Sequence, residues 1–190
     1  MKNLLFKYLK AIKSKLIDQW QYIYLVYDLD SNFSSLPKLD DSITIRLADR
    51  GDLKKIKEDI FPEIEEIEND KTLFEQIGQE HFDCFIALRG QRIIHYFQFY
   101  YSAKLSPLTK TPYGKKIMEN SDAYLGSTYT SKDYRSMWIV PHTITKILDL
   151  LKERQDIKRA LVLVHSETVG AENFYKRLGF EVVNSNNNEK

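Results

Sequence analysis

A short, almost entirely apolar run near the C-terminus constrains the fold of this chain more than any other feature. Residues 159–164 read RALVLV and show none of the alternation expected of a strand with one wet face. Such a continuous run is typical of a strand buried on both faces of a sheet, with helices covering each side. Helical patterns flank it at residues 138–152 and 170–178. We therefore expect an α/β domain.

The other elements predict a mixed sheet. Residues 42–48, 83–88, 91–101, 123–130 and 180–183 have strand character, and Arg89-Gly90 is a hairpin signal. Asp49 is a candidate N-cap for a helix that Pro62 ends, and a second, acidic helix is expected between residues 64 and 77. Antiparallel strands thus come first in the chain and βαβ crossovers last.

The first 40 residues are expected to form an N-terminal extension, because residues 31–41 read as a linker before a main domain at 41–190. Residues 2–20 predict an amphipathic helix, and residues 21–30 predict a strand. The basic helix would pack on its own domain, contact a partner subunit such as a second copy of the chain, or lie on an anionic membrane surface. Its lysines interrupt the apolar stretch too often for a secretion signal.

Composition excludes several classes of protein. The chain has 7 glycines in 190 residues, and their scatter rules out the clustered glycines of dinucleotide and P-loop motifs. The 28 basic and 27 acidic residues nearly cancel, so a nucleic-acid partner is not expected. A single cysteine, Cys84, and 4 dispersed histidines predict neither disulfide nor metal site, and a cytoplasmic setting is the expectation.

One C-terminal segment carries a resemblance. Residues 168–180 read TVGAENFYKRLGF, which is similar to the N-x-x-A-x-x-x-Y-x-x-x-G-F segment of the GNAT superfamily of acyl-CoA-dependent N-acyltransferases. Ala171, Tyr175, Gly179 and Phe180 match by spacing, whereas Thr168 stands where that pattern has Asn. The order of elements from residue 42 to 183 also resembles that superfamily. The resemblance implies a mixed central sheet with flanking helices.

The superfamily's second motif, R/Q-x-x-G-x-G/A, aligns with residues 135–140, which read RSMWIV. Trp138 and Val140 replace the two small residues. The resemblance implies that acetyl-CoA or another acyl-CoA is bound there, because backbone N–H groups at a helix N-terminus hold pyrophosphate. The cofactor-binding residues it implies are Thr128, Tyr129, Thr130, Arg135, Ser136, Met137, Trp138, Ile139, Val140 and Thr168.

The implied chemistry is direct attack of a primary amine on the thioester, with a small molecule as acceptor. The oxyanion would be held by backbone N–H groups at a strand bulge near Thr128–Thr130, and Tyr175 would protonate the leaving thiolate. His165, at the end of the buried strand, is the candidate base, and no metal is implied. The alternative is a GNAT-like protein that has lost the cofactor loop and serves as a binding or assembly module.

Overall fold

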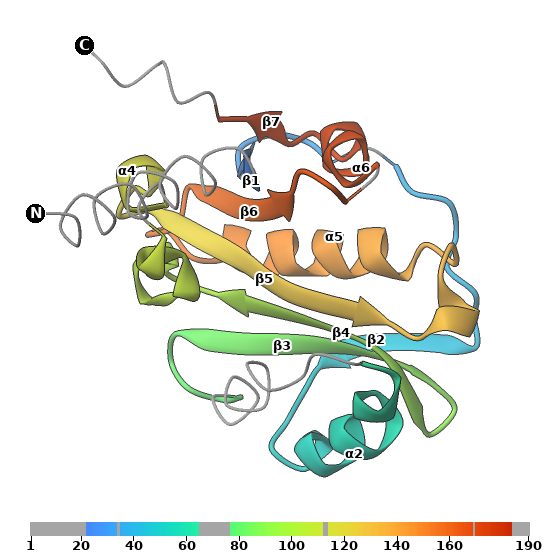
Figure 1. Ribbon diagram of the computed structural model, residues 1–190. Helices are drawn as coiled ribbons and strands as arrows, with labels where there is room; N and C mark the ends of the chain where they lie inside the picture. The colour runs from blue at the N-terminus through green and yellow to red at the C-terminus, as the bar shows by residue number, and fades with distance from the viewer. Residues whose placement is uncertain (1–21, 34, 65–76, 112–113, 169, 184–190) are drawn as a thin grey trace, which may run out of the picture.

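The computed structural model describes residues 22–33, 35–64, 77–111, 114–168 and 170–183 (Figure 1). Seven strands form one mixed sheet in the order β2-β3-β4-β5-β6-β1-β7. The strands are β1 (Tyr22–Asp28), β2 (Ile43–Leu47), β3 (Phe82–Arg89), β4 (Arg92–Tyr100), β5 (Asp122–Thr130), β6 (Arg159–His165) and β7 (Glu181–Val182). The α-helices are α2 (Asp52–Asp59), α4 (Gly114–Ile117), α5 (Ile139–Lys152) and α6 (Ala171–Arg177). Short 3-10 helices are η1 (Phe61–Glu63), η2 (Ala103–Leu105), η3 (Pro107–Lys110) and η4 (Lys132–Tyr134).

Side chains alternate along the strands between two buried faces. The apolar side of α5 and the inner side of α6 join one cluster with the strands, whereas α2 and η1 join a second cluster on the other face. A third cluster, under η2, η3 and α4, covers the part of that second face formed by β1, β5 and β6. Figure 1 places α2 near the β2–β4 end of the sheet and α6 near the β1–β7 end. The expected mixed α/β fold is confirmed.

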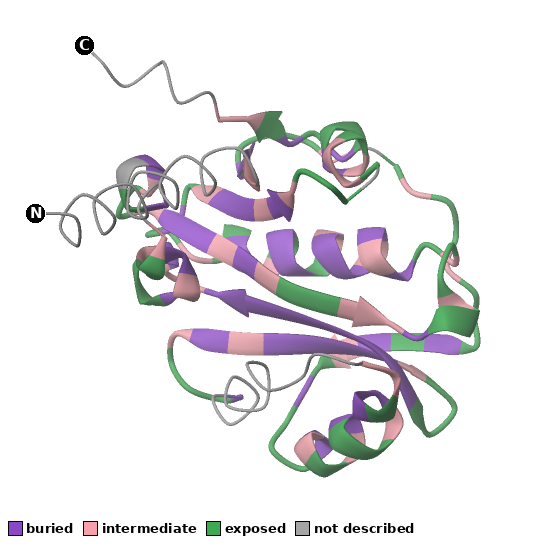
Figure 2. Cartoon of the chain, viewed as in Figure 1, coloured by how far each residue is buried: buried purple, intermediate pink, exposed green. Residues whose placement is uncertain are grey.

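Strand β6 is buried on both faces, as its apolar run predicts. Ala160, Val162 and Val164 face the α5 cluster, whereas Leu161 and Leu163 face the cluster under η2 and α4. Figure 2 shows the buried colour along β6 and on the inner side of α5. β6 runs parallel to β5 and antiparallel to β1, and these two neighbours lie about 100 residues apart in the sequence, at Asp122–Thr130 and Tyr22–Asp28.

Strand β1 belongs to the main sheet rather than to a separate extension. It pairs antiparallel with all of β6, from Tyr22↔His165 to Asp28↔Arg159, and also with β7 through Leu25↔Val182. The expected boundary near residue 40 therefore divides residues that share one sheet and one core. The strand expected at residues 21–30 is present as β1, but the helix expected at 2–20 lies outside the described residues.

The segment expected to be a linker, residues 31–41, packs against α5. Phe33, Leu36 and Leu39 contact the α5 cluster. At its two ends, Lys152 Nζ donates to the Ser31 carbonyl at 3.0 Å, and the His142 ring meets the Pro37 carbonyl at 2.8 Å. This segment therefore runs along α5 toward its N-terminus. The acidic helix expected between residues 64 and 77 lies almost wholly outside the described residues.

Asp49 caps α2, although the helix itself begins at Asp52. The Asp49 carboxylate accepts hydrogen bonds from the backbone N–H of Gly51 at 2.7 Å and of Asp52 at 3.2 Å. The Asp52 carboxylate accepts in return from the Asp49 N–H at 2.9 Å and forms a two-point contact with Arg46. This reciprocal arrangement is a capping box, and it ties α2 to β2.

Gly179 ends α6 and seats it on β1. The N–H of Gly179 donates to the Lys176 carbonyl, and the N–H of Phe180 donates to the Tyr175 carbonyl, which is a Schellman ending. Gly179 has φ +93°, and a Cβ there would lie 3.2 Å from a ring carbon of Tyr27. The position therefore needs glycine for two reasons, its backbone angle and its close approach to a neighbouring ring.

We predict that Gly179→Ala lowers the free energy of unfolding by roughly 2–3 kcal/mol, because it adds a ring contact to left-handed strain. Gly90→Ala is the matched control, since Gly90 also has a positive φ, +59°, but a Cβ there meets nothing within 4 Å. Urea unfolding of the two variants measures the difference. Equal losses in both would contradict the proposed contact with Tyr27.

Candidate active site

Strands β5 and β6 separate part-way along the sheet. They pair in parallel from Asp122↔Arg159 to Leu125↔Val162, and no pairing continues beyond that point among the described residues. Strand β5 runs on to Thr130, and β6 runs on to His165 with β1 as its partner. Figure 2 shows β5 becoming exposed in this second half. An opening therefore forms in the middle of the sheet, at the carboxyl ends of two parallel strands.

A bulge in β5 begins this separation. Along β4, Phe97 and Phe99 are two residues apart, yet their partners on β5, Thr128 and Leu125, are three apart. The extra residue lies at Gly126-Ser127, and a Cβ on Gly126 would come within 3.3 Å of the Gln98 carbonyl oxygen. The bulge expected near Thr128–Thr130 lies immediately before Thr128. The small residue that allows the close approach is Gly126.

Backbone N–H groups converge where α5 begins. Ser136 and Trp138 both have left-handed angles, φ 70° and 60°. The N–H groups from Ser136 to Val140 donate to no acceptor among the described residues. Turns of this kind form anion-binding concavities, and the dipole of a 14-residue helix adds to the effect. Pro141, the third residue of α5, contributes no donor.

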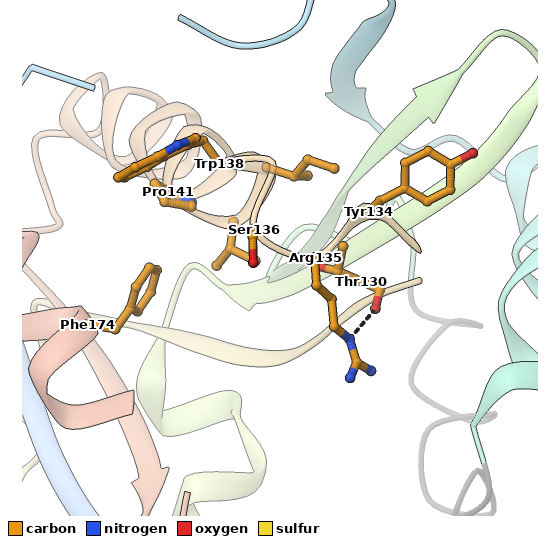
Figure 3. A pocket seen from close by; sticks show the side chains of 9 residues that line it. Thr130, Tyr134, Arg135, Ser136, Trp138, Pro141 and Phe174 are labelled. Carbon is orange, nitrogen blue, oxygen red and sulfur yellow. Dashed lines mark hydrogen bonds between the residues drawn. The ribbon is translucent and has the colours of Figure 1, made fainter. Parts of the chain in front are cut away.

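A pocket of about 380 Å³ lies in front of these N–H groups (Figure 3). Its walls come from the end of β5, the loop after it, the first turn of α5, and α6. The lining residues are Thr130, Tyr134, Arg135, Ser136, Trp138, Ile139, Val140, Pro141 and Phe174. Seven of the ten expected cofactor-binding residues lie between positions 130 and 140, and six of those seven line this pocket.

Trp138 has an unusual backbone for its residue type. A bulky residue in the left-handed region is a conformational outlier that costs about 1–2 kcal/mol. The indole is 48% exposed and lines the pocket beside Pro141. This is the position where the R/Q-x-x-G-x-G/A pattern has its first glycine, so the backbone keeps a glycine-like angle although the residue has changed.

Tyr175 lies on the same side of the sheet as α5, inside the core. It is 8% exposed, and its ring packs edge-on against Phe174 and Phe180. Burial raises the pKa of the Tyr175 hydroxyl, and the phenol of Tyr124 raises it further. Its neighbour Phe174, rather than Tyr175, lines the pocket. The hydroxyl has no hydrogen-bond partner among the described residues.

His165 lies at the end of β6 but outside the pocket. Its ring meets the Tyr22 ring edge-on at 5.2 Å, and its Nδ1 accepts a hydrogen bond from the Glu167 N–H at 3.3 Å. By strand alternation it shares a face with Leu161 and Leu163, opposite the face that holds Tyr175. The structure therefore does not bring the two predicted catalytic residues together on one side of the sheet.

The remaining predicted residues lie around the opening with different roles. Thr128 donates through its hydroxyl to the Tyr96 carbonyl at 2.9 Å, and Tyr129 extends toward η1, so neither lines the pocket. Met137 also lies outside the pocket lining, on the other side of Trp138. Thr168 is exposed in the turn before α6, where its carbonyl accepts from the Ala171 N–H.

Comparison with known protein families decides the classification. The model of the acetyltransferase (GNAT) family matches residues 51–180, more than half of the chain. The chain belongs to the GNAT acetyltransferase family. No curated protein matches it.

Solved structures of GNAT proteins and others share the fold. Arabidopsis thaliana NAA60 in complex with acetyl-CoA superposes with a TM-score of 0.56 and 19% identity, covering 75% of this chain and 86% of that one. AAC(6')-Iy in complex with the bisubstrate analogue CoA-S-monomethyl-acetylneamine gives 0.55 and 14%, covering 73% and 90%. A functionally unknown conserved protein from Staphylococcus epidermidis ATCC 12228 gives 0.54 and 7%, covering 85% of this chain, which spans 57% of that protein. At these identities the likeness shows the fold alone.

Two negative findings apply to the part of the GNAT chain that the structure describes. Within it, no helix combines the length and apolarity needed to cross a membrane. Within the same residues, His, Cys, Asp and Glu side chains nowhere gather in threes as a metal ion would require.

Glu63 is a residue of the GNAT domain that sequence reasoning did not single out, because it directly precedes the segment expected to form an acidic helix. Its carboxylate accepts from the Tyr129 hydroxyl at 3.2 Å, the Ser131 hydroxyl at 3.0 Å and the Arg92 guanidinium at 2.9 Å. Its side chain is 23% exposed. Glu63 therefore fastens η1 to the end of β5, immediately before the loop that forms the pocket. Only its position directly after Pro62, where the helix ends, distinguishes it from the other acids in the sequence.

His95 lies behind the pocket wall and supports it. It is fully buried, and its Nδ1 lies 2.9 Å from the hydroxyl of Thr130, whose carbonyl accepts from Arg135 Nε at 3.2 Å. Burial lowers the pKa of His95 to about 3. His95 is therefore a packed residue with one hydrogen-bonded ring nitrogen, and its ring is neutral at physiological pH.

We predict that His95 makes the GNAT domain sensitive to acid. The folded pKa, about 3, lies below the ordinary value of 6.5, so the unfolded chain binds a proton first and stability falls as the pH drops below 6.5. Between pH 8 and pH 5 this group alone costs about 2 kcal/mol. Urea unfolding of wild type and His95→Gln at both pH values tests this. The prediction fails if the variant loses as much stability as the wild type.

Proposed function

We propose that the chain transfers an acyl group from acetyl-CoA or a related acyl-CoA to a primary amine of a small molecule. The observation that carries the proposal is the run of free backbone N–H groups from Ser136 to Val140, which opens onto the pocket at the N-terminus of α5. This arrangement fits a diphosphate, because several donors and a helix dipole point at one place. Arg135, also in the pocket lining, adds a positive charge.

The acyl-CoA would supply an acyl group activated as a thioester. The residues of this chain would hold it with the diphosphate at the α5 N-terminus and the thioester in the opening between β5 and β6. Among the described residues, the pairing of β5 with β6 ends at Leu125, so the edge of β5 near Thr128–Thr130 would face the thioester carbonyl oxygen with backbone N–H groups. Donors fixed in this way stabilise the negative charge that develops on that oxygen during attack.

Tyr175 would donate the proton that the leaving thiolate requires. Its raised pKa keeps the hydroxyl protonated at neutral pH. Burial also disfavours a thiolate formed beside it, so the sulfur becomes a stronger base in the same surroundings. The lack of a hydrogen-bond partner among the described residues leaves the Tyr175 proton free for this transfer.

The acceptor amine would approach from the other face of the sheet. His165 and Glu167 lie there at the end of β6, with the Glu167 carboxylate 4.0 Å from His165 Nδ1. His165 is 34% exposed at its side chain, as a base that meets a substrate must be. Two of the similar structures support an acyl-CoA co-substrate, since one is a complex with acetyl-CoA and the other a complex with the bisubstrate analogue CoA-S-monomethyl-acetylneamine. The cytoplasm, where acyl-CoA is available, is the setting we propose.

We predict that Tyr175→Phe lowers kcat about 10²–10⁴-fold while the dissociation constant of acetyl-CoA stays within about threefold, because only the acid is lost. Tyr27→Phe is the matched control. Tyr27 is also buried, and both rings lie 5.2 Å from the Phe180 ring. Thiol release with a panel of small primary amines gives kcat, and calorimetry gives the dissociation constant. Equal rates for Tyr175→Phe and Tyr27→Phe would remove Tyr175 from the mechanism.

We predict that the wild-type protein binds acetyl-CoA with a dissociation constant below about 1 mM, the upper range usual for enzyme substrates. Isothermal calorimetry on the full chain measures it. Trp138 favours the alternative, a GNAT-fold binding module, because its side chain stands at a glycine position beside the N–H groups. Absence of binding at several millimolar acetyl-CoA would favour that module over the transferase.

A further inference from the structure

The side chains of Trp138 and Phe174 line two walls of the pocket. Neither side chain has a role in the proposed binding of the diphosphate, which uses backbone N–H groups. Trp138 comes from the start of α5 and Phe174 from α6, so two elements far apart in the sequence place aromatic rings around one space (Figure 3). Arg135 is the charged residue of the lining, which is otherwise mostly apolar. A flat apolar group fits such walls better than a charged one does.

The strained backbone of Trp138 also indicates that its ring has a role. Any non-glycine residue is disfavoured at φ 60°, and a smaller side chain would fit the same turn. The indole is nevertheless 48% exposed, so it contributes little to the core in return. Strain of this kind is characteristic of ligand-contacting positions, where the side chain acts in binding.

We infer that Trp138 and Phe174 form an aromatic slot for the adenine base of the acyl-CoA, an inference that rests on the proposed function. Adenosine is bonded directly to the diphosphate, so a diphosphate held by the N–H groups of Ser136–Val140 brings the base within reach of both rings. Bases stack on aromatic side chains irrespective of hydrogen bonding.

A second hollow, of about 510 Å³, lies on the other side of Trp138. Its charges decide which of the two hollows the nucleotide would occupy. Lys38, Asp40, Asp41 and Met137 line it. Its two carboxylates outnumber its single ammonium, and Lys38 is already paired with Asp41 at 2.7 Å. Phosphate groups are repelled from that side and attracted to the N–H groups. The nucleotide therefore occupies the pocket that Trp138 shares with Phe174.

Fluorescence provides a direct readout of stacking. The chain has 2 tryptophans, so Trp20→Phe leaves Trp138 as the single tryptophan, which is excited selectively at wavelengths that tyrosine does not absorb. In this background, CoA and adenosine 3′,5′-bisphosphate quench the emission, whereas acetyl-4′-phosphopantetheine, which lacks the base, leaves it unchanged. Quenching by the phosphopantetheine alone, or no quenching by bound CoA, overturns the inference.

Trp138→Gly removes the ring and relaxes the backbone, and Trp138→Phe keeps an aromatic ring as the control. Because Trp138→Gly removes one stacking partner of the base, we expect it to weaken CoA binding about 5- to 150-fold. Binding of acetyl-4′-phosphopantetheine, which has no base, should change less than about threefold. Trp138→Phe should stay within about fivefold of the wild type for both. Unchanged or tighter CoA binding by Trp138→Gly means that the indole obstructs the pocket, and the inference is then wrong.

The two proposals fail in different ways. If wild type binds neither CoA nor acetyl-4′-phosphopantetheine, both the proposed acyltransferase function and the proposed adenine slot are wrong. If wild type binds both, and Trp138→Gly changes both by the same factor, the transferase stands and the adenine slot does not. Phe174→Leu gives an independent check from the opposite wall, where the same selective loss of CoA over acetyl-4′-phosphopantetheine is expected.

Discussion

The pairing of β5 with β6 ends after Leu125, and the candidate site depends on that interruption. A parallel pair that continued to Thr130 would fill the sheet with hydrogen bonds and leave no room for a ligand. The bulge at Gly126-Ser127 turns β5 away, and the capacity of β6 to pair with β1 instead keeps its own backbone satisfied. The free-energy cost of interrupting the backbone hydrogen-bond ladder in the middle of the sheet is therefore limited to the few backbone groups of β5 that face the opening.

Much of this architecture could be predicted from the sequence because local patterns and tertiary structure agree. The run at 159–164 predicts a strand buried on both faces, and the pattern at 170–178 predicts a helix before Gly179; both are confirmed. The position of β1 could not be predicted, since nothing local in YIYLVYD says which strand it pairs with. The linker punctuation after it also misleads, because Phe33, Leu36 and Leu39 bury side chains on α5 while the backbone remains irregular.

The candidate site was predictable in part. The turn expected at residues 135–140 is present, because Ser136 and Trp138 adopt left-handed backbone angles without glycine. Side-chain roles transfer less well. Thr128 and Tyr129 occupy the right strand yet use their hydroxyls elsewhere, since alternation along β5 decides which face each one meets. Glu63 shows the reverse case, because its role depends on partners at Arg92, Tyr129 and Ser131 that lie far along the chain.

The place of β1 between β6 and β7 has a consequence for how the chain is made. β1 is synthesised before its main partner, β6, whose first residue, Arg159, follows Tyr22 at the start of β1 by 137 positions. Until then its aromatic residues have no sheet to join, and closing so long a loop is slow. Residues 42–130 can pair with near neighbours meanwhile, so the half of the sheet beyond β5 assembles last. A nascent chain of this protein therefore leaves the aromatic side chains of β1 without their final packing partners until β6 has been made.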